Sequence, residues 1–127
     1  MLTTKNLEQR RTFETTAMLD FVDITDEVIA IATESGIENG RVTVFSPHPS
    51  CSILANERES GLLRDIERAL AKIEAAGRPP HTLHVGAQSV VVPIADGELR
   101  LGTWQRLLLV ELGSPSQRTV IVQLMGE

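Results

Sequence analysis

Three histidines are the residues of this chain best suited to metal chemistry, and all of them lie between positions 48 and 84. His48 stands between two prolines, and His81 and His84 form an HxxH pair just after Pro79-Pro80. Imidazole is a common protein ligand for zinc and copper, and a catalytic zinc needs three protein ligands and one open position. The alternatives are surface histidines in a polar linker at 81 and 84, and a loop histidine at 48 that hydrogen-bonds a backbone carbonyl.

Asn56 and Glu57 form a second group of candidates, because they follow a short apolar stretch. At the end of a strand, the amide and the carboxylate would project together into a cleft. The same pair is also typical of a helix cap followed by an acid in the first turn. Both interpretations stay open on the pattern alone.

Trp104 and Gln105 form a third group, at the start of an apolar strand. A tryptophan usually packs in a core with its N–H bonded, and a glutamine beside it could bind a polar atom of a ligand. Cys51 is the only cysteine. It would act as a nucleophile only if a histidine lowered the pKa of its thiol, and small buried cysteines are commoner than reactive ones.

The composition is that of one soluble globular domain over residues 1–127, with 42% hydrophobic and 23% charged residues. Residues 1–11 are expected to be a polar N-terminal extension or an edge strand. The net charge of −5 disfavours nucleic-acid binding, which needs clustered Lys and Arg. No segment reaches the ~20 apolar residues of a membrane helix, and no apolar signal-peptide core follows the polar start. We therefore expect a cytoplasmic protein without nucleic-acid or membrane partners.

The elements that must position these residues follow from hydrophobic periodicity. Alternation from Phe13 to Phe21 predicts a half-buried strand. Thr25, followed by two acids, predicts the capped start of a helix that ends at Gly36. A second amphipathic helix is predicted from about Ser60 to Gly77. Further strands or short apolar stretches are expected at 41–45, 52–55, 88–94, 99–101, 106–112 and 118–125.

Two helices and about seven strands indicate the fold class. Most connections are too short for parallel crossovers, and Asp96-Gly97 is a strong hairpin signal. The pattern predicts a compact α+β domain with a largely antiparallel β-sheet core, shaped like a sandwich or a barrel. The strands at 106–112 and 118–125 are apolar on both faces, so they are expected to lie centrally.

Several motifs together resemble the YjbQ family, often described as secondary thiamine-phosphate synthase enzymes. The most specific are SPH at 46–48, NE at 56–57 and DGxLxLGTWQ at 96–105. DITDEV at 23–28 and the final VIVQLMGE also match. The resemblance covers roughly residues 12 to 127.

The resemblance implies a homotrimer with a histidine cleft that holds a divalent metal, usually zinc. It further implies the coupling of a pyrimidine diphosphate with a thiazole phosphate, so that the ligand is a small phosphorylated metabolite. It implies that His48 is a metal ligand, joined by His81, His84 or both, that Glu57 and Gln105 are catalytic residues, and that Asn56 and Trp104 bind the substrate.

Two departures from the family pattern motivate other functions. Pro49 and Ser50 stand where the family usually has threonines, and HTLH replaces the usual histidine-x-histidine segment. A non-catalytic trimeric binding or scaffold protein with a degenerate site is one alternative. A metal-dependent phosphate-ester hydrolase that uses the same ligands is the other.

Overall fold

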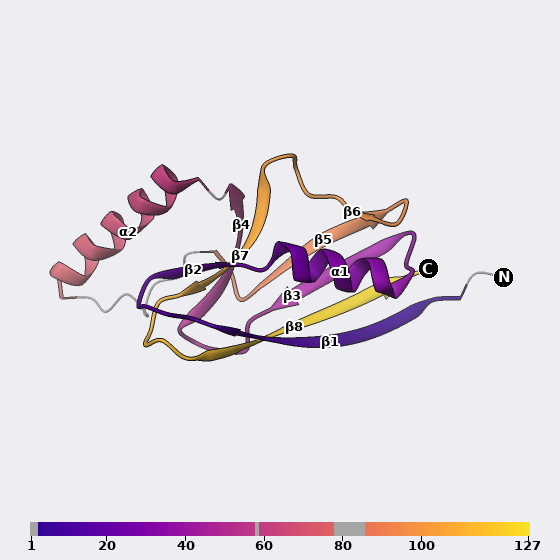
Figure 1. Cartoon of the computed structure of the whole chain (residues 1–127), viewed down its shortest axis with the longest axis horizontal. Helices are drawn as coiled ribbons and strands as arrows, with labels where there is room; N and C mark the ends of the chain where they lie inside the picture. Colours follow the sequence, from indigo (N-terminus) through magenta and orange to yellow (C-terminus); the bar gives the residue numbers. More distant parts are fainter. Residues whose placement is uncertain (1–2, 58, 78–85) are drawn as a thin grey trace.

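A computed structural model describes residues 3–57, 59–77 and 86–127 of the chain (Figure 1). Its elements, in chain order, are β1 (Lys5–Glu14), β2 (Asp20–Asp23), α1 (Thr25–Ser35), β3 (Gly40–Phe45), β4 (Cys51–Glu57), α2 (Ser60–Ala75), β5 (Ser89–Ala95), β6 (Glu98–Leu99), β7 (Gln105–Glu111) and β8 (Gln117–Gly126).

The strands form two sheets. The larger has the order β1-β8-β3-β5-β6 and the smaller the order β2-β7-β4. Every strand pair is antiparallel, and an isolated bridge between Ile53 and Ala87 links the sheets. The α+β class with a largely antiparallel core and two helices is therefore confirmed.

The first and last strands lie side by side over their whole length. Lys5 pairs with Gly126 at one end of the ladder, and Glu14 pairs with Gln117 at the other. β1 is consequently an edge strand, and most of its side chains are exposed. β8 lies inside the sheet because β3 pairs with its other edge.

Apolar side chains from both sheets and from α1 form the main core. In Figure 1, α1 lies across the five-stranded sheet, while α2 stands at one end of the molecule. β7 is the middle strand of its sheet, and Leu107 to Glu111 are all buried. The predicted central positions of β7 and β8 are thus confirmed. The main core includes Ile24, Val28, Ile31, Val42, Val44, Ile53, Leu107, Leu109, Val122 and Leu124.

A second apolar cluster attaches α2 to the other face of β7. Leu70 of α2 is buried with Leu108 and Val110. α2 begins near Ser60 as predicted, and Glu59 caps it by accepting hydrogen bonds from the backbone N–H groups of the first turn. The Asp96-Gly97 hairpin is also confirmed, since it joins β5 to β6. No helix in the described ranges is long and apolar enough to cross a membrane.

The single strand predicted from Phe13 to Phe21 is wrong, because the chain turns between β1 and β2. Asp20 accepts hydrogen bonds from Thr16, at 2.8 Å from the backbone N and 3.2 Å from Oγ1. Leu19 adopts the left-handed region with φ 63°. These local bonds close a turn that the regular alternation of apolar and polar residues conceals.

The predicted hydroxyl cap at Thr25 is also wrong. The residue before the first turn of α1 is Ile24, and no side chain caps that end. The Thr25 hydroxyl instead donates to Asp23 Oδ1 at 2.6 Å and accepts the N–H of Leu107 at 2.8 Å. Thr25 therefore ties α1 to β7. Gly36 ends the helix as predicted, with φ 71°.

Candidate functional site

Strand β4 separates the predicted site residues into two groups. Asn56 and Glu57 lie at its end, and His48 precedes its start. Seven residues at ~3.3 Å per residue place the two ends about 20 Å apart. One chain therefore does not bring His48 and Glu57 into a single site. His81 and His84 lie outside the described residues.

A cleft of about 510 Å³ lies at the Glu57 end of β4, and we call it the Trp104 cleft. Segments far apart in the sequence meet there: the end of β2, the end of β4, the residue that caps α2, and the loop that leads into β7. The residues that line it are Asp23, Glu57, Glu59, Thr103, Trp104 and Arg106. Two of the predicted site residues, Glu57 and Trp104, thus share one cleft.

Trp104 does not pack in the core. Its relative exposure is 74%, the highest among the exposed large apolar side chains of the described residues. The loop that carries it is closed by Gln105, whose Oε1 accepts the N–H of Gly102 at 2.8 Å. The N–H of Gln105 donates to the carbonyl of Gly102 at 3.0 Å. Gln105 therefore positions the tryptophan, and its amide oxygen is already engaged.

Glu57 lies opposite Gln105 in the β4–β7 ladder. Of the two interpretations of Asn56-Glu57, the strand end is therefore confirmed. Asn56 Oδ1 accepts the N–H of Glu57 at 2.8 Å, so this side chain orders the strand end and is not among the cleft-lining residues. The carboxylate of Glu57 has no hydrogen-bond or ion-pair partner in the described part of the chain and is available to a ligand.

Arg106 is held by two carboxylates at the edge of the cleft. Its Nε lies 2.8 Å from Asp23 Oδ2, and one terminal nitrogen lies 3.4 Å from Asp26 Oδ1. Burial by itself would raise the pKa of Asp23, but hydrogen bonds from Arg106 and Thr25 outweigh it and hold that pKa below its usual value. Asp23 is therefore ionised at neutral pH.

Asp23, Glu59 and Arg106 are cleft residues that sequence reasoning missed. Asp23 belongs to the DITDEV segment, which predicts only the start of a helix. Glu59 binds the N–H groups of Gly61 and Leu62, each at 2.8 Å. The signal that could have located Asp23 and Arg106 is their opposite charge at the ends of two strands that pair with each other, β2 and β7.

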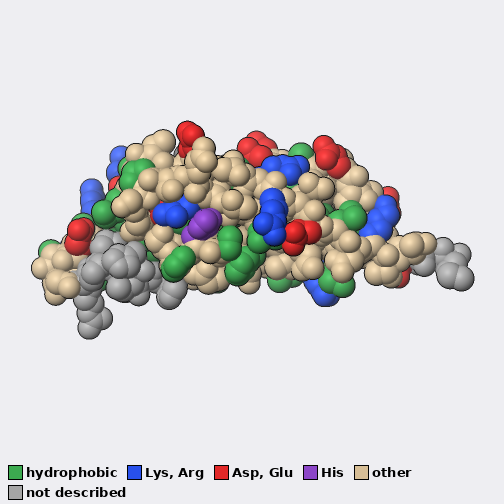
Figure 2. Space-filling view, turned by 90° about the horizontal axis from the view of Figure 1, so that it is seen from below, with side chains coloured by type: hydrophobic (Ala, Val, Ile, Leu, Met, Phe, Trp, Pro, Cys, Tyr) green, Lys and Arg blue, Asp and Glu red, His purple; other side chains and the backbone are tan. Residues whose placement is uncertain are grey.

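His48 lies just before the other end of β4, and its side chain binds the backbone of β8. Its Nε2 accepts the backbone N–H of Thr119 at 3.1 Å, so the partner is an N–H and not the expected carbonyl. With Nε2 as the acceptor, Nδ1 is the ring nitrogen left to donate a hydrogen bond. Figure 2 shows a histidine side chain at the surface, next to a basic side chain. His48 is the one histidine among the described residues.

The described residues do not fit a zinc ion. Within residues 3–57, 59–77 and 86–127, no group of three or more His, Cys, Asp or Glu side chains is placed to hold a metal. The Nε2 lone pair of His48 is already used within the fold. The other two expected ligands, His81 and His84, fall outside these ranges, so the zinc site stays a prediction.

A buried ion pair, missed by sequence reasoning, lies near the start of β4. Glu111 is fully buried, and its Oε1 lies 2.7 Å from Nε of Arg118. The carboxylate also accepts hydrogen bonds from the Thr15 hydroxyl at 2.8 Å and the Ser50 hydroxyl at 3.2 Å. Burial raises the pKa of Glu111, but hydrogen bonds from Arg118, Thr15, Cys51 and the Gly113 N–H, the one from Arg118 being the strongest, outweigh it and lower that pKa overall.

Cys51 belongs to the same buried group and is not activated. Its side chain is 1% exposed, and its Sγ donates to Glu111 Oε2 at 3.2 Å. Burial, the hydrogen bond to Glu111 and the negative charge of that carboxylate raise the pKa of the Cys51 thiol to about 11. The thiol is therefore protonated at neutral pH, which disfavours the nucleophile interpretation.

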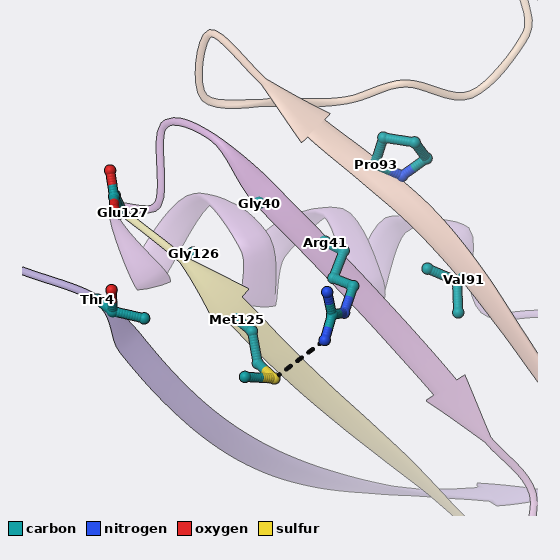
Figure 3. Close-up of a pocket in the computed structure, with 8 residues that line it drawn as sticks. All are labelled: Thr4, Gly40, Arg41, Val91, Pro93, Met125, Gly126 and Glu127. Atoms are coloured by element: carbon teal, nitrogen blue, oxygen red, sulfur yellow. Dashed lines mark hydrogen bonds between the residues drawn. The ribbon is translucent and has the colours of Figure 1, made fainter.

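A shallow pocket on the larger sheet contains none of the predicted site residues. Figure 3 shows Arg41, Met125 and Val91 extending from neighbouring strands on one face of that sheet. Arg41 donates to the sulfur of Met125 at 3.5 Å. The Trp104 cleft is the better candidate site, because Glu57 and Trp104 line it.

Comparison with known proteins gives consistent matches over nearly the whole chain. The family model described as UPF0047 protein YjbQ-like matches residues 9–127. A UPF0047 protein of Archaeoglobus fulgidus is 36% identical, with 90% of this chain and 98% of that protein aligned. UPF0047 protein YugU of Bacillus subtilis is 31% identical, with 89% and 95% aligned.

Solved structures resemble the fold equally well. A YbjQ-like protein of unknown function from Sulfolobus solfataricus superposes with a TM-score of 0.88 at 33% identity, covering 98% of this chain and all of that one. A hypothetical protein from Aeropyrum pernix gives a TM-score of 0.83 at 29% identity, covering 95% and 99% of the two chains.

Proposed function

The chain belongs to the UPF0047 protein YjbQ-like family, and from this membership and the geometry of the Trp104 cleft we propose that it is an enzyme acting on a small phosphorylated metabolite. The reaction is of the thiamine-phosphate synthase type, in which a pyrimidine diphosphate is coupled with a thiazole phosphate. The observation that carries the proposal is that Trp104, from the loop before β7, and Glu57, from the end of β4, line one cleft.

The chemistry places specific demands on the cleft. A bond forms between the thiazole nitrogen and the methylene carbon of the pyrimidine, and the bond from that carbon to the diphosphate oxygen breaks. The electron pair leaves with pyrophosphate, so positive charge develops on the carbon and passes to the thiazole nitrogen. Preorganised negative groups near such a charge lower the barrier.

Residues of the Trp104 cleft would meet two of these demands, the orientation of the ring and the stabilisation of the developing positive charge. The exposed indole of Trp104 stacks on the pyrimidine ring and fixes its orientation. The free carboxylate of Glu57 accepts a hydrogen bond from the exocyclic amino group and stabilises the developing positive charge. Gln105 acts as a positioning residue, because it closes the loop that holds Trp104.

The assembly that we propose is a homotrimer. His48 and Glu57 lie at opposite ends of β4, so they act on one substrate only if the His48 end of one copy adjoins the Trp104 cleft of another. Symmetric interfaces commonly form such shared sites. In this arrangement, two copies of the chain could each supply ligands to the predicted zinc site.

The experiment is a coupling assay with the purified full chain, the pyrimidine diphosphate and the thiazole phosphate. We expect thiamine phosphate and pyrophosphate as products. The coupling rate should fall by a factor of about ten or more in Glu57→Gln and in Trp104→Ala. Glu67→Gln, which removes an exposed carboxylate of α2, is the matched control and should keep the full rate.

Two outcomes would contradict the proposal. Release of phosphate from simple phosphate esters without coupling would favour a hydrolase. Binding of the substrates with no turnover above the buffer rate would favour a non-catalytic binding protein.

A further inference from the structure

We infer that the Trp104 cleft binds the cationic or amine-bearing ring of its ligand and that phosphate groups bind outside it. The inference rests on the proposed function only in placing the substrate at this cleft. It adds the charge class of the group that enters and separates the ring subsite from the phosphate subsite.

The aromatic surface is the first support. Trp104 exposes 74% of its surface on a loop that Gln105 holds closed. The indole is therefore presented to the cleft by a defined loop conformation and not by a free chain. The face of an indole carries negative electrostatic potential, which attracts cations and electron-poor rings.

The balance of charge is the second support. Three carboxylates line the cleft, those of Asp23, Glu57 and Glu59, and Arg106 is the one cation among the described lining residues. Like charges of this number would repel a phosphate. The Glu59 carboxylate also accepts hydrogen bonds from the backbone N–H groups of Gly61 and Leu62.

Arg106 is not available to offset this charge. It pairs with Asp23 inside the cleft and with Asp26 beside it. A phosphate would have to replace both carboxylates around a guanidinium whose side chain is only 37% exposed. The carboxylate of Glu57, by contrast, has no hydrogen-bond or ion-pair partner among the described residues, and this exposed residue lines the cleft, where an amine can reach it.

The experiment uses the fluorescence of Trp104, because it is the only tryptophan of the chain. Full-length protein is titrated with three rings of similar shape: 1-methylnicotinamide, which is cationic, nicotinamide, which is neutral, and nicotinate, which is anionic. We expect saturable quenching by the cation at a concentration about tenfold lower than for the anion. Added salt should reduce the difference.

Variants test the assigned residue. Glu57→Gln should weaken the cation about fivefold and leave the neutral ring unchanged, and Glu57→Lys should reverse the preference in favour of nicotinate. Glu67→Gln is the matched control and should behave like the parent protein. Thermal unfolding of each variant checks that the fold is retained, which we expect because Glu57 is exposed at a strand end.

The results separate this inference from the proposed function. Equal affinity for cation and anion, or no change in Glu57→Gln, would overturn the inference even if coupling activity is measured. A cation preference that depends on Glu57 supports it, and still does so if the coupling assay fails.

Discussion

The carboxylate of Glu111 is fully buried and yet favoured in its ionised form. Arg118, Thr15, Ser50 and Cys51 all direct hydrogens at its two oxygens. An ionised group excluded from water is tolerable only when its partners replace the lost hydration. The single negative charge of Glu111 therefore holds several strands and loops together through hydrogen bonds.

The pH dependence of stability should report on Glu111. Its pKa is lowered in the folded state from an ordinary value of 4.5. The stabilisation is thus complete above the unfolded pKa and is lost as the pH falls through the lower, folded value. We expect the urea midpoint to decrease as the pH falls below about 4.5.

Glu111→Gln tests the same residue at neutral pH. It leaves the guanidinium of Arg118, 17% exposed, without its ionic partner, and we expect a loss of about 3 kcal/mol in the free energy of unfolding. The acid sensitivity should also become weaker than in the control Glu67→Gln. Parallel pH profiles for the two variants would mean that other carboxyl groups cause the acid sensitivity.

At the scale of elements, the sequence predicts those that repeat a simple pattern. β7 and β8 follow from their apolar runs, and the β5–β6 hairpin follows from Asp96-Gly97, because these signals are local. The turn between β1 and β2 does not follow, since Asp20 closes it by binding Thr16 within an unbroken alternation. Local pattern cannot distinguish a side chain that continues a strand from one that ends it.

The residues of the candidate site were also predicted only in part. The family resemblance joined Glu57 and Trp104, and they share a cleft. It also joined His48 to them, although β4 separates the two ends, because a motif carries no information on the distances between its residues in the fold. Arg106 was missed because its partners Asp23 and Asp26 precede it by some 80 residues.

Thr25 connects α1 to β7 and offers a test at this scale. Thr25→Val removes the oxygen that accepts the N–H of Leu107 and leaves that buried donor unsatisfied. We expect a loss of about 2 kcal/mol in the free energy of unfolding, measured in urea. Thr33→Val makes the same change at an exposed position of α1 and should cost much less. Equal losses would point to helix propensity as the cause.

At the scale of the molecule, one face of the five-stranded sheet carries exposed apolar side chains. Phe45 is 38% exposed and Val91 56%, and both belong to strands inside the sheet. Apolar surface of this kind is often covered by another copy in an assembly. The proposed homotrimer would provide such cover.

The mass in solution tests that proposal. We expect light scattering to give the mass of a trimer of 13.9 kDa chains, and Val91→Glu to shift the mass toward the monomer if this face forms the contact. Val91→Thr keeps the β-branched shape and is the matched control. A parent protein that stays monomeric at micromolar concentration would contradict the trimer.

The pairing of β1 with β8 also has a consequence for biosynthesis. β8 is synthesised after β1 and β3, and yet it lies between them in the larger sheet. β1 therefore has no strand to pair with in the larger sheet until β8 has been synthesised. Contacts so distant in sequence are associated with slow folding. The nascent chain should accordingly remain protease-sensitive while β8 is inside the ribosome, and should become resistant only once that strand has emerged.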